Sequence, residues 1–216
     1  PVNKARAIEL YKKAADEGFE EAQGALGVCY ATGNGVPKND CEAFRWFSMA
    51  AEQGEEFAQK NLAICYRNGD GIPVNKALAA QCFEKAAAQG NIQAKSCLAD
   101  MYAEGEGIIA NYNKAETFYN EVIANGASNY YDSPVFSLAL MYATKTNNHY
   151  RAFPLWQQLA SRGNTTAKYN LGLCYHNGWG AAKDDSQALY WWRQAAAEGH
   201  ADAQSNARIL KQEMQG

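Results

Sequence analysis

The chain has 216 residues, of which 47% are hydrophobic and 20% charged, and its formal net charge is -3 at pH 7. This composition is typical of a globular chain of one or two domains and excludes an intrinsically disordered protein. The mild acidity argues against a nucleic-acid-binding protein, which carries a basic patch. Because no apolar run approaches the ~18 residues of a membrane span, we predict no membrane insertion.

A step of 36 or 37 residues runs through the sequence and defines its organisation. The glycines that mark it are Gly18, Gly54, Gly90, Gly126, Gly163 and Gly199. A tyrosine column follows a similar step, at Tyr30, Tyr66, Tyr102, Tyr142 and Tyr175. Such self-similarity predicts stacked two-helix units, each of which buries its apolar stripe against its neighbours.

Each repeat is predicted to contain two helices, which we call the first-type and the second-type helix. In chain order, the period predicts a lone second-type helix over residues 1–18, five repeats, and a final first-type helix over residues 200–216. The repeats are 19–54, 55–90, 91–126, 127–163 and 164–199. We therefore predict twelve helices in a single all-α domain, an α/α solenoid in which antiparallel helix pairs form a right-handed superhelix. The opening PVNKARA matches PVNKALA at residues 73–79, so we expect a fragment of a longer protein. Any signal sequence would be missing from such a fragment, which leaves the compartment open between cytoplasm and export.

Within the repeat 19–54, two helical stretches flank the turn GNGVP at residues 33–37. Paired glycines recur at four such turns, which favours connectors that end a helix over a phosphate-binding loop. Asp40 is the predicted N-cap of the second helix and Gly54 its stop. The second helices share an aromatic column that we expect in the core, opposite small residues: Tyr11, Phe47, Phe83, Tyr119, Trp156 and Trp192.

Two motifs carry a resemblance to a known family. The patterns A-x-x-x-L-G-x-x-Y-x-x-G-x-G-V and A-x-x-W-[FWY]-x-x-A-A-x-x-G fit best over residues 22–54 and 167–199. They resemble the Sel-1-like repeat, a relative of the tetratricopeptide repeat. The resemblance implies an α/α solenoid that serves as a scaffold for protein–protein contacts, often in bacterial signalling, envelope or host-interaction proteins. It implies no catalytic residues.

The fourth repeat departs from this pattern. It gains residues at SNYYDSPV and loses the glycine turn where ATKTNNHY stands. Its first helix is predicted to start at Pro134, after a cap at Ser133. Its second helix is expected to start late or to bend, because Pro154 lies where other repeats have helix interior. The insertion is either drift with local repair or a recognition feature that displays Tyr130 and Tyr131.

Side chains that could carry chemistry are interpreted mainly as structural. The six cysteines have irregular spacing, which favours free thiols over helix pairs stapled by disulfides and indicates no metal site. Asn164 begins an NTT glycosylation acceptor but stands where a first-type helix starts, so a cap is favoured. Trp46, Trp191 and Trp192 could form a ligand-stacking box, but the repeat column that Trp46 shares with Trp191 favours the core. Trp179 lies between turn glycines, where other repeats carry polar residues, and is predicted to be an exposed contact.

A partner is expected on the concave face, which the resemblance assigns to the first helix of each pair. Helical spacing places variable residues on the stripe of these helices that points away from the second helix. The predicted partner-binding residues are Lys60, Arg67, Asn68, Ser96, Glu104, Phe136, Tyr169, His176 and Asn177. This mixture of aromatic, amide and charged side chains could hold a peptide. It could equally be a face that tolerates variation.

The predicted function is therefore a non-enzymatic scaffold for a protein or peptide partner of unknown identity, with no cofactor and with a monomer favoured. Two alternatives stay open. One is a hydrolase-type enzyme, as some relatives have been labelled, which would need a nucleophile and a base in one pocket. The other is a purely structural spacer between domains.

Overall fold

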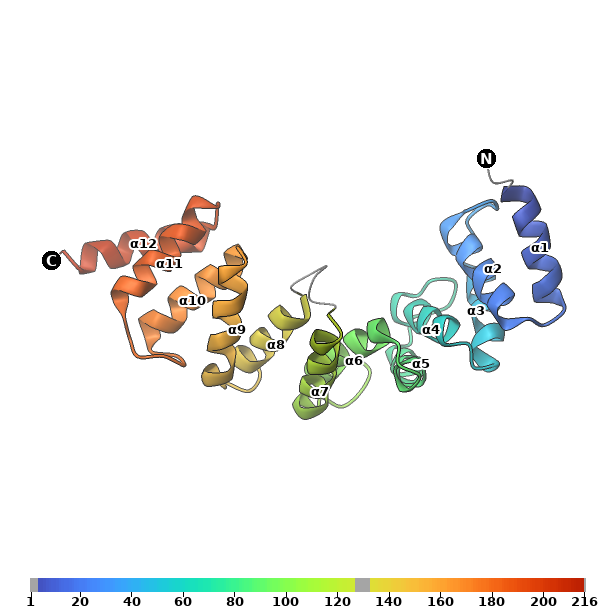
Figure 1. The fold of residues 1–216 in the computed structure, drawn as a ribbon, viewed down its shortest axis with the longest axis horizontal. Helices are drawn as coiled ribbons and strands as arrows, with labels where there is room; N and C mark the ends of the chain where they lie inside the picture. Colours follow the sequence, from blue (N-terminus) through green and yellow to red (C-terminus); the bar gives the residue numbers. More distant parts are fainter. Residues whose placement is uncertain (1–3, 127–132, 216) are drawn as a thin grey trace. The chain divides into compact units, whose positions relative to one another are not determined.

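The computed structural model describes residues 4–126 and 133–215, and within these residues the chain forms twelve α-helices and no β-strand (Figure 1). The helices are α1 (Lys4–Asp16), α2 (Glu20–Thr32), α3 (Asp40–Glu52), α4 (Glu56–Asn68), α5 (Lys76–Ala88), α6 (Ile92–Glu104), α7 (Tyr112–Ala124), α8 (Ser133–Thr144), α9 (His149–Ser161), α10 (Thr165–Asn177), α11 (Asp185–Ala197) and α12 (Ala201–Glu213). The predicted number and order of helices are confirmed for the described residues.

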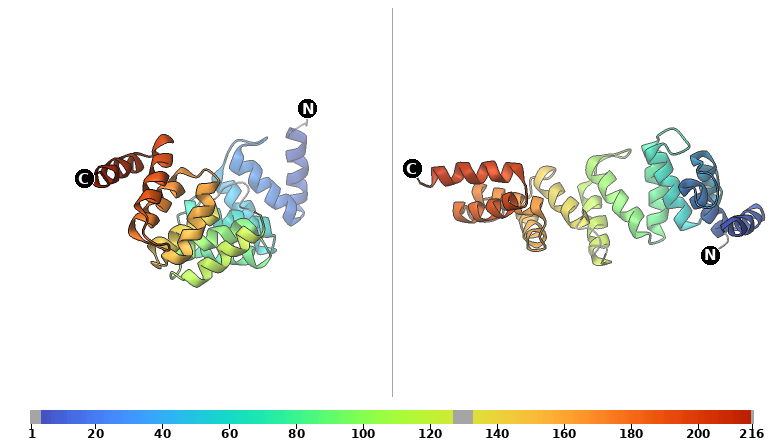
Figure 2. Two further views of the ribbon diagram at one scale, coloured as in Figure 1. Left: turned by 60° about the vertical axis from the view of Figure 1, so that its left-hand side comes forward. Right: turned by 90° about the horizontal axis from the view of Figure 1, so that it is seen from above.

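The helices form two compact units, Pro1–Asn125 (the N-terminal unit) and Gly126–Gly216 (the C-terminal unit). Consecutive helices pack against each other from α1 to α7 within the N-terminal unit and from α8 to α12 within the C-terminal unit (Figure 2). Packing that is dominated by helices adjacent in sequence is the arrangement of a solenoid, so the predicted fold class is confirmed. That residues 1–216 form one domain stays a prediction.

The two glycines of each turn have different tasks, as the turn after α6 shows. Gly105 has a left-handed φ of +72° and its N–H bonds the carbonyl of Met101, which ends the helix. Gly107, at φ +75°, lies against the start of α5 in the preceding repeat. A Cβ at this position would lie 2.5 Å from the carbonyl oxygen of Lys76. The second glycine therefore permits close contact between one repeat and the turn of the next.

Helix α3, a second-type helix, has its side-chain cap one residue earlier than predicted. Asn39, not Asp40, is the N-cap of α3, and its Oδ1 accepts from the N–H of Glu42 at 3.1 Å. The cap oxygen must reach the third N–H of the helix, which Asn39 does and Asp40 does not. The N–H of Asn39 also bonds the carbonyl of Tyr30 at 2.9 Å, which links the cap to the preceding helix.

The predicted cap of α10 is confirmed, because Asn164 Oδ1 accepts from the N–H of Ala167 at 2.8 Å.

The fourth repeat keeps the common register despite its altered sequence. Helix α8 begins at Ser133, one residue before the predicted start at Pro134. Of the two alternatives predicted for α9, the late start is wrong, since this helix begins at His149 with Pro154 inside it, and the bend at Pro154 stays a prediction. The missing N–H of the proline leaves the carbonyl of Tyr150 without its helical partner, and Tyr150 is 82% exposed, so water can bond it. Tyr130 and Tyr131 lie outside the described residues.

Five of the six side chains of the aromatic column lie in the core. Phe47, Phe83, Tyr119, Trp156 and Trp192 are each 3% exposed or less. Glycine or alanine of the first helices faces these rings. A Cβ on Gly27, for example, would lie 2.6 Å from the ring of Phe47.

The first residue of the aromatic column differs from the rest. Tyr11 is 42% exposed, because no described helix precedes α1 to cover it. Trp46, which neighbours the column, is 3% exposed, so its assignment to the core is confirmed, whereas Trp191 is only half-buried.

Candidate functional site

Two of the predicted partner-binding residues hold adjacent repeats together. Lys60 in α4 is only 8% exposed; its Nζ donates to Gln93 Oε1 at 3.2 Å and lies 4.4 Å from the ring centroid of Phe57. Burial lowers the pKa of Lys60, against the opposite effect of nearby acidic groups. Tyr169 in α10 stacks on His200 with ring centroids 4.4 Å apart. Both side chains bridge one first-type helix to the following repeat.

Two further predicted residues are also engaged in packing. Phe136 in α8 is half-buried and meets Trp156 edge-on, with ring centroids 5.3 Å apart. Arg67 at the end of α4 donates to Cys97 Sγ at 3.5 Å, and its guanidinium lies 5.7 Å from the ring centroid of Phe83. Arg67 therefore fills the space between the first-type helices α4 and α6.

The remaining predicted residues of the N-terminal unit lie closer to solvent. Asn68 and Glu104 are exposed at the ends of α4 and α6, and Ser96 is half-buried. The amide of Asn68 donates to Asp70 Oδ2 in the adjoining turn at 3.2 Å. These three side chains belong to the first-type helices α4 and α6.

In the C-terminal unit, a groove of about 290 Å³ lies between the first-type helices α10 and α12, and we call it the α10/α12 groove. It is lined by Leu173, His176, Asn177, Trp192, Asn206, Ile209, Leu210 and Glu213. The α12 residues among them are three and four positions apart, so one face of that helix forms the wall. The groove brings together His176 and Asn177, two of the predicted partner-binding residues.

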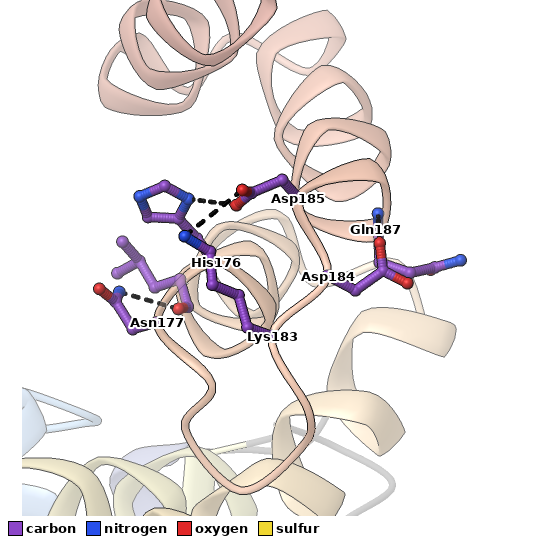
Figure 3. A network of polar contacts seen from close by, with 7 residues as sticks. His176, Asn177, Lys183, Asp184, Asp185 and Gln187 are labelled. Carbon is purple, nitrogen blue, oxygen red and sulfur yellow. Dashed lines mark hydrogen bonds and ion pairs between the residues drawn. The ribbon is translucent and has the colours of Figure 1, made fainter. Parts of the chain in front are cut away.

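His176 is held by a polar network at the base of the neighbouring turn (Figure 3). Its Nδ1 lies 2.7 Å from Asp185 Oδ1, and Lys183 Nζ is 3.4 Å from the other oxygen of that carboxylate. Partial burial raises the pKa of Asp185, but the bonds from His176 and Lys183 outweigh it and hold the pKa below its usual range.

The His176–Asp185 pair resembles two members of a hydrolytic triad, but within the described residues no serine, threonine or cysteine hydrogen-bonds His176. The contact with Asp185 orients the imidazole of His176 at the groove.

A second groove, of about 300 Å³, lies between α8 and α10 and is mostly apolar. We call it the α8/α10 groove; it is lined by Leu140, Ala143, Thr144, Asn147, His149, Trp156, Asn170, Leu173, Cys174 and Trp179. Trp179 is 40% exposed and stacks on His149, with centroids 4.5 Å apart and planes 5° apart. The predicted exposure of Trp179 is confirmed, and the ring forms part of a groove wall.

One column of this face is not among the predicted partner-binding residues. This column lies two residues before the tyrosine column in each repeat and continues into α12. Its members are Val28, Ile64, Asp100, Leu140, Leu173 and Ile209. In the C-terminal unit, Leu140 is 41% and Ile209 48% exposed, and Leu173 lines both grooves. The repeat spacing contains this signal, because the column is mostly apolar and recurs on the same side of the first-type helices.

Each groove also contains a half-buried asparagine on its first-type helix. Asn170 lies in the α8/α10 groove and Asn206, 36 residues later, in the α10/α12 groove. Neither side chain hydrogen-bonds another residue within 4–126 and 133–215, whereas the equivalent Asn61 donates to the carbonyl of Phe57 at 2.9 Å. A side-chain amide both donates and accepts, so each could pair with a peptide group of a ligand.

The other candidate chemistry is structural. All six cysteines are free thiols, and burial raises the pKa of Cys65 and of Cys174 to about 11. Within the described parts of the chain, no group of three metal-ligating side chains comes together. Among the twelve helices of those residues, none combines the length and hydrophobicity that crossing a bilayer requires.

Helix pairs of constant length, glycine turns that contact the preceding repeat and grooves between the first-type helices define a repeat protein of the α/α solenoid class. The Sel1 repeat family model matches residues 1–19, 20–55, 57–91, 97–126 and 165–200, so the chain belongs to the Sel1 repeat family. Proteins of this family are generally protein-interaction scaffolds and typically non-catalytic.

Two solved structures are similar over nearly the whole chain. One is a protective antigen present in uropathogenic Escherichia coli strains, which displays an SLR fold; it is 34% identical with a TM-score of 0.76, and the match covers 95% of this chain and 44% of that protein. The other is a Sel1 repeat protein from Oxalobacter formigenes, 27% identical with a TM-score of 0.69, where the match covers 96% of this chain and 87% of the other. This chain thus spans less than half of the Escherichia coli protein.

Proposed function

We propose that this chain is a non-enzymatic module that binds a peptide or protein partner on the face formed by its first-type helices, the expected concave face. The context we infer is a bacterial signalling, envelope or host-interaction protein. The bacterial sources of both similar structures, one of them a protective antigen, support that context.

The observation that carries this proposal is the pair of adjoining grooves in the C-terminal unit. The α8/α10 and α10/α12 grooves share Leu173, and they expose apolar side chains beside half-buried amides that have no partner in the described residues. Neither amide is fully buried, so a ligand can reach and bond the donor and the acceptor of each. An extended peptide offers backbone N–H and C=O groups together with apolar side chains.

A photo-crosslinking amino acid tests the location. Placed at Asn177 in the bacterium that produces the protein, it should give a defined adduct with a partner. The matched control is Gln157, which is exposed on the second-type helix α9 and lines neither groove. The same adduct from both positions, or none from Asn177, would contradict the proposal and favour a spacer.

A further inference from the structure

We propose that the C-terminal unit recognises a two-part signal in an extended peptide. A bulky apolar or aromatic side chain occupies the α8/α10 groove, and a lysine or arginine about three residues away occupies the α10/α12 groove. This inference rests on the proposed function and specifies the chemistry of the partner.

The α8/α10 groove is open because a small residue stands where another repeat carries a large one. Ala143 occupies the repeat position of Arg67, whose guanidinium fills the corresponding space in the N-terminal unit and reaches Cys97. With alanine in that place, the groove extends down to Trp156 in α9. Its volume of about 300 Å³ lies at the lower end of the ~300–1,000 Å³ that ligand pockets occupy. One large side chain of a peptide is an occupant of suitable size.

The wall of this groove is preorganised. Trp179 stacks on His149 with nearly parallel rings, and the adjoining Gly180 packs so tightly on α9 that a Cβ would lie 2.7 Å from Phe153 Cβ. The turn is therefore fixed against α9 before any ligand binds. A rigid aromatic wall favours an apolar or aromatic partner group, because little conformational entropy is lost on contact.

The α10/α12 groove contributes a negative charge that is not compensated. Within the described residues, the carboxylate of Glu213 has no ion pair or hydrogen bond, whereas Asp185 is already paired with both His176 and Lys183. Ile209, one helical turn before Glu213, is 48% exposed in the same groove. An apolar surface that leads to a free carboxylate is complementary to lysine or arginine, whose aliphatic stem covers the apolar part while the head group reaches the charge.

The spacing of the two parts follows from helix geometry. Leu173 borders both grooves, which are thus one helix apart. Packed helices lie about 8–10 Å apart, and an extended chain in the polyproline II conformation advances about 3.1 Å per residue with three residues per turn, so side chains three apart point to the same side. The two side chains of the ligand are therefore about three residues apart.

The groove between α2 and α4 in the N-terminal unit differs, because an internal ion pair between Lys38 and Asp40 (3.2 Å) borders it. Asp70, the other carboxylate that lines this groove, accepts a hydrogen bond from the amide of Asn68 at 3.2 Å, whereas Glu213 has no such bond within the described residues.

The test is selection of a phage-displayed library of random 12-residue peptides on the chain. We expect enrichment of peptides that pair an aromatic or leucine residue with a lysine or arginine about three positions away. The synthetic consensus peptide is then measured by fluorescence polarisation. Glu213→Lys should weaken it tenfold or more, the range expected for loss of a charge-assisted hydrogen bond.

Replacing the basic residue of the peptide by glutamate should restore binding to the Glu213→Lys variant.

Two variants make the test specific. Asp202→Lys changes the net charge equally on α12 but lies outside the α10/α12 groove, and should change the affinity less than twofold. Ala143→Arg should fill the α8/α10 groove and abolish the preference for the apolar residue. Circular dichroism and thermal melting establish that each variant is folded.

Enriched peptides without this pairing, or an affinity indifferent to Glu213→Lys, would overturn the inference while leaving the proposed function intact. A library that yields no peptide competing at this face would count against both.

Discussion

The second glycine of each turn should be the less replaceable one, and the turn after α6 offers a matched pair. Gly105 and Gly107 have nearly equal φ values, +72° and +75°. Alanine at either position pays a similar cost for the left-handed backbone, about 1–2 kcal/mol, and changes the unfolded chain equally. The two sites differ in what the new methyl group would meet.

The magnitude follows from those surroundings. A Cβ on Gly105 has its nearest neighbour at 3.5 Å, an ordinary van der Waals contact. A Cβ on Gly107 would lie 2.5 Å from the carbonyl oxygen of Lys76, a backbone atom that cannot turn aside. Overpacking of this kind costs about 1–3 kcal/mol more. We therefore expect Gly105→Ala to lower the free energy of unfolding by about 1–2 kcal/mol and Gly107→Ala by about 2–5 kcal/mol.

Urea denaturation followed by far-UV circular dichroism measures both variants. Because repeat arrays can unfold in steps, midpoints are compared only where the slope m is unchanged. Equal destabilisation by the two substitutions would refute the reasoning. Gly107 would then be needed only for its left-handed backbone conformation, and not for the close contact between repeats.

Three further outcomes are expected. Phe83 is fully buried, so Phe83→Ala should cost about 3–5 kcal/mol in urea denaturation, and a loss below 1 kcal/mol would contradict its place in the core. Hydrogen bonds, chiefly from Lys168, hold the pKa of Glu198 in the folded protein below its usual value. Ionised Glu198 therefore stabilises the fold at pH values above its unfolded-state pKa of about 4, and this stabilisation is lost as the pH falls through the lower pKa of the folded state. Thermal melts at pH 7 and pH 3 should therefore show a smaller acid-induced decrease for Glu198→Gln, and an equal decrease would contradict this. At pH 8 a thiol reagent should label exposed Cys41 quickly and buried Cys174 only after denaturation, because burial raises the pKa of Cys174 to about 11; labelling at equal rates would disprove it.

The repeat architecture could be predicted from the sequence because its signals are local and recur at a constant step. Gly105 ends a helix through its own torsion, and Phe47 or Phe83 reports a buried stripe through helical spacing. The sequence did not decide the cap of α3, because Asn39 and Asp40 are both good caps. Only the backbone shows which side-chain oxygen reaches the N–H of Glu42.

The grooves depended on contacts between residues that are distant in sequence. Trp179 could be predicted to be exposed, but its stacking on His149 requires the turn to fold back on α9. Lys60 and Tyr169 occupy the variable stripe, yet both point into the next repeat. Helical periodicity specifies which side of a helix a residue occupies. Whether that side faces solvent or a neighbour is fixed by the distance and angle between helices, which the packing of whole repeats sets.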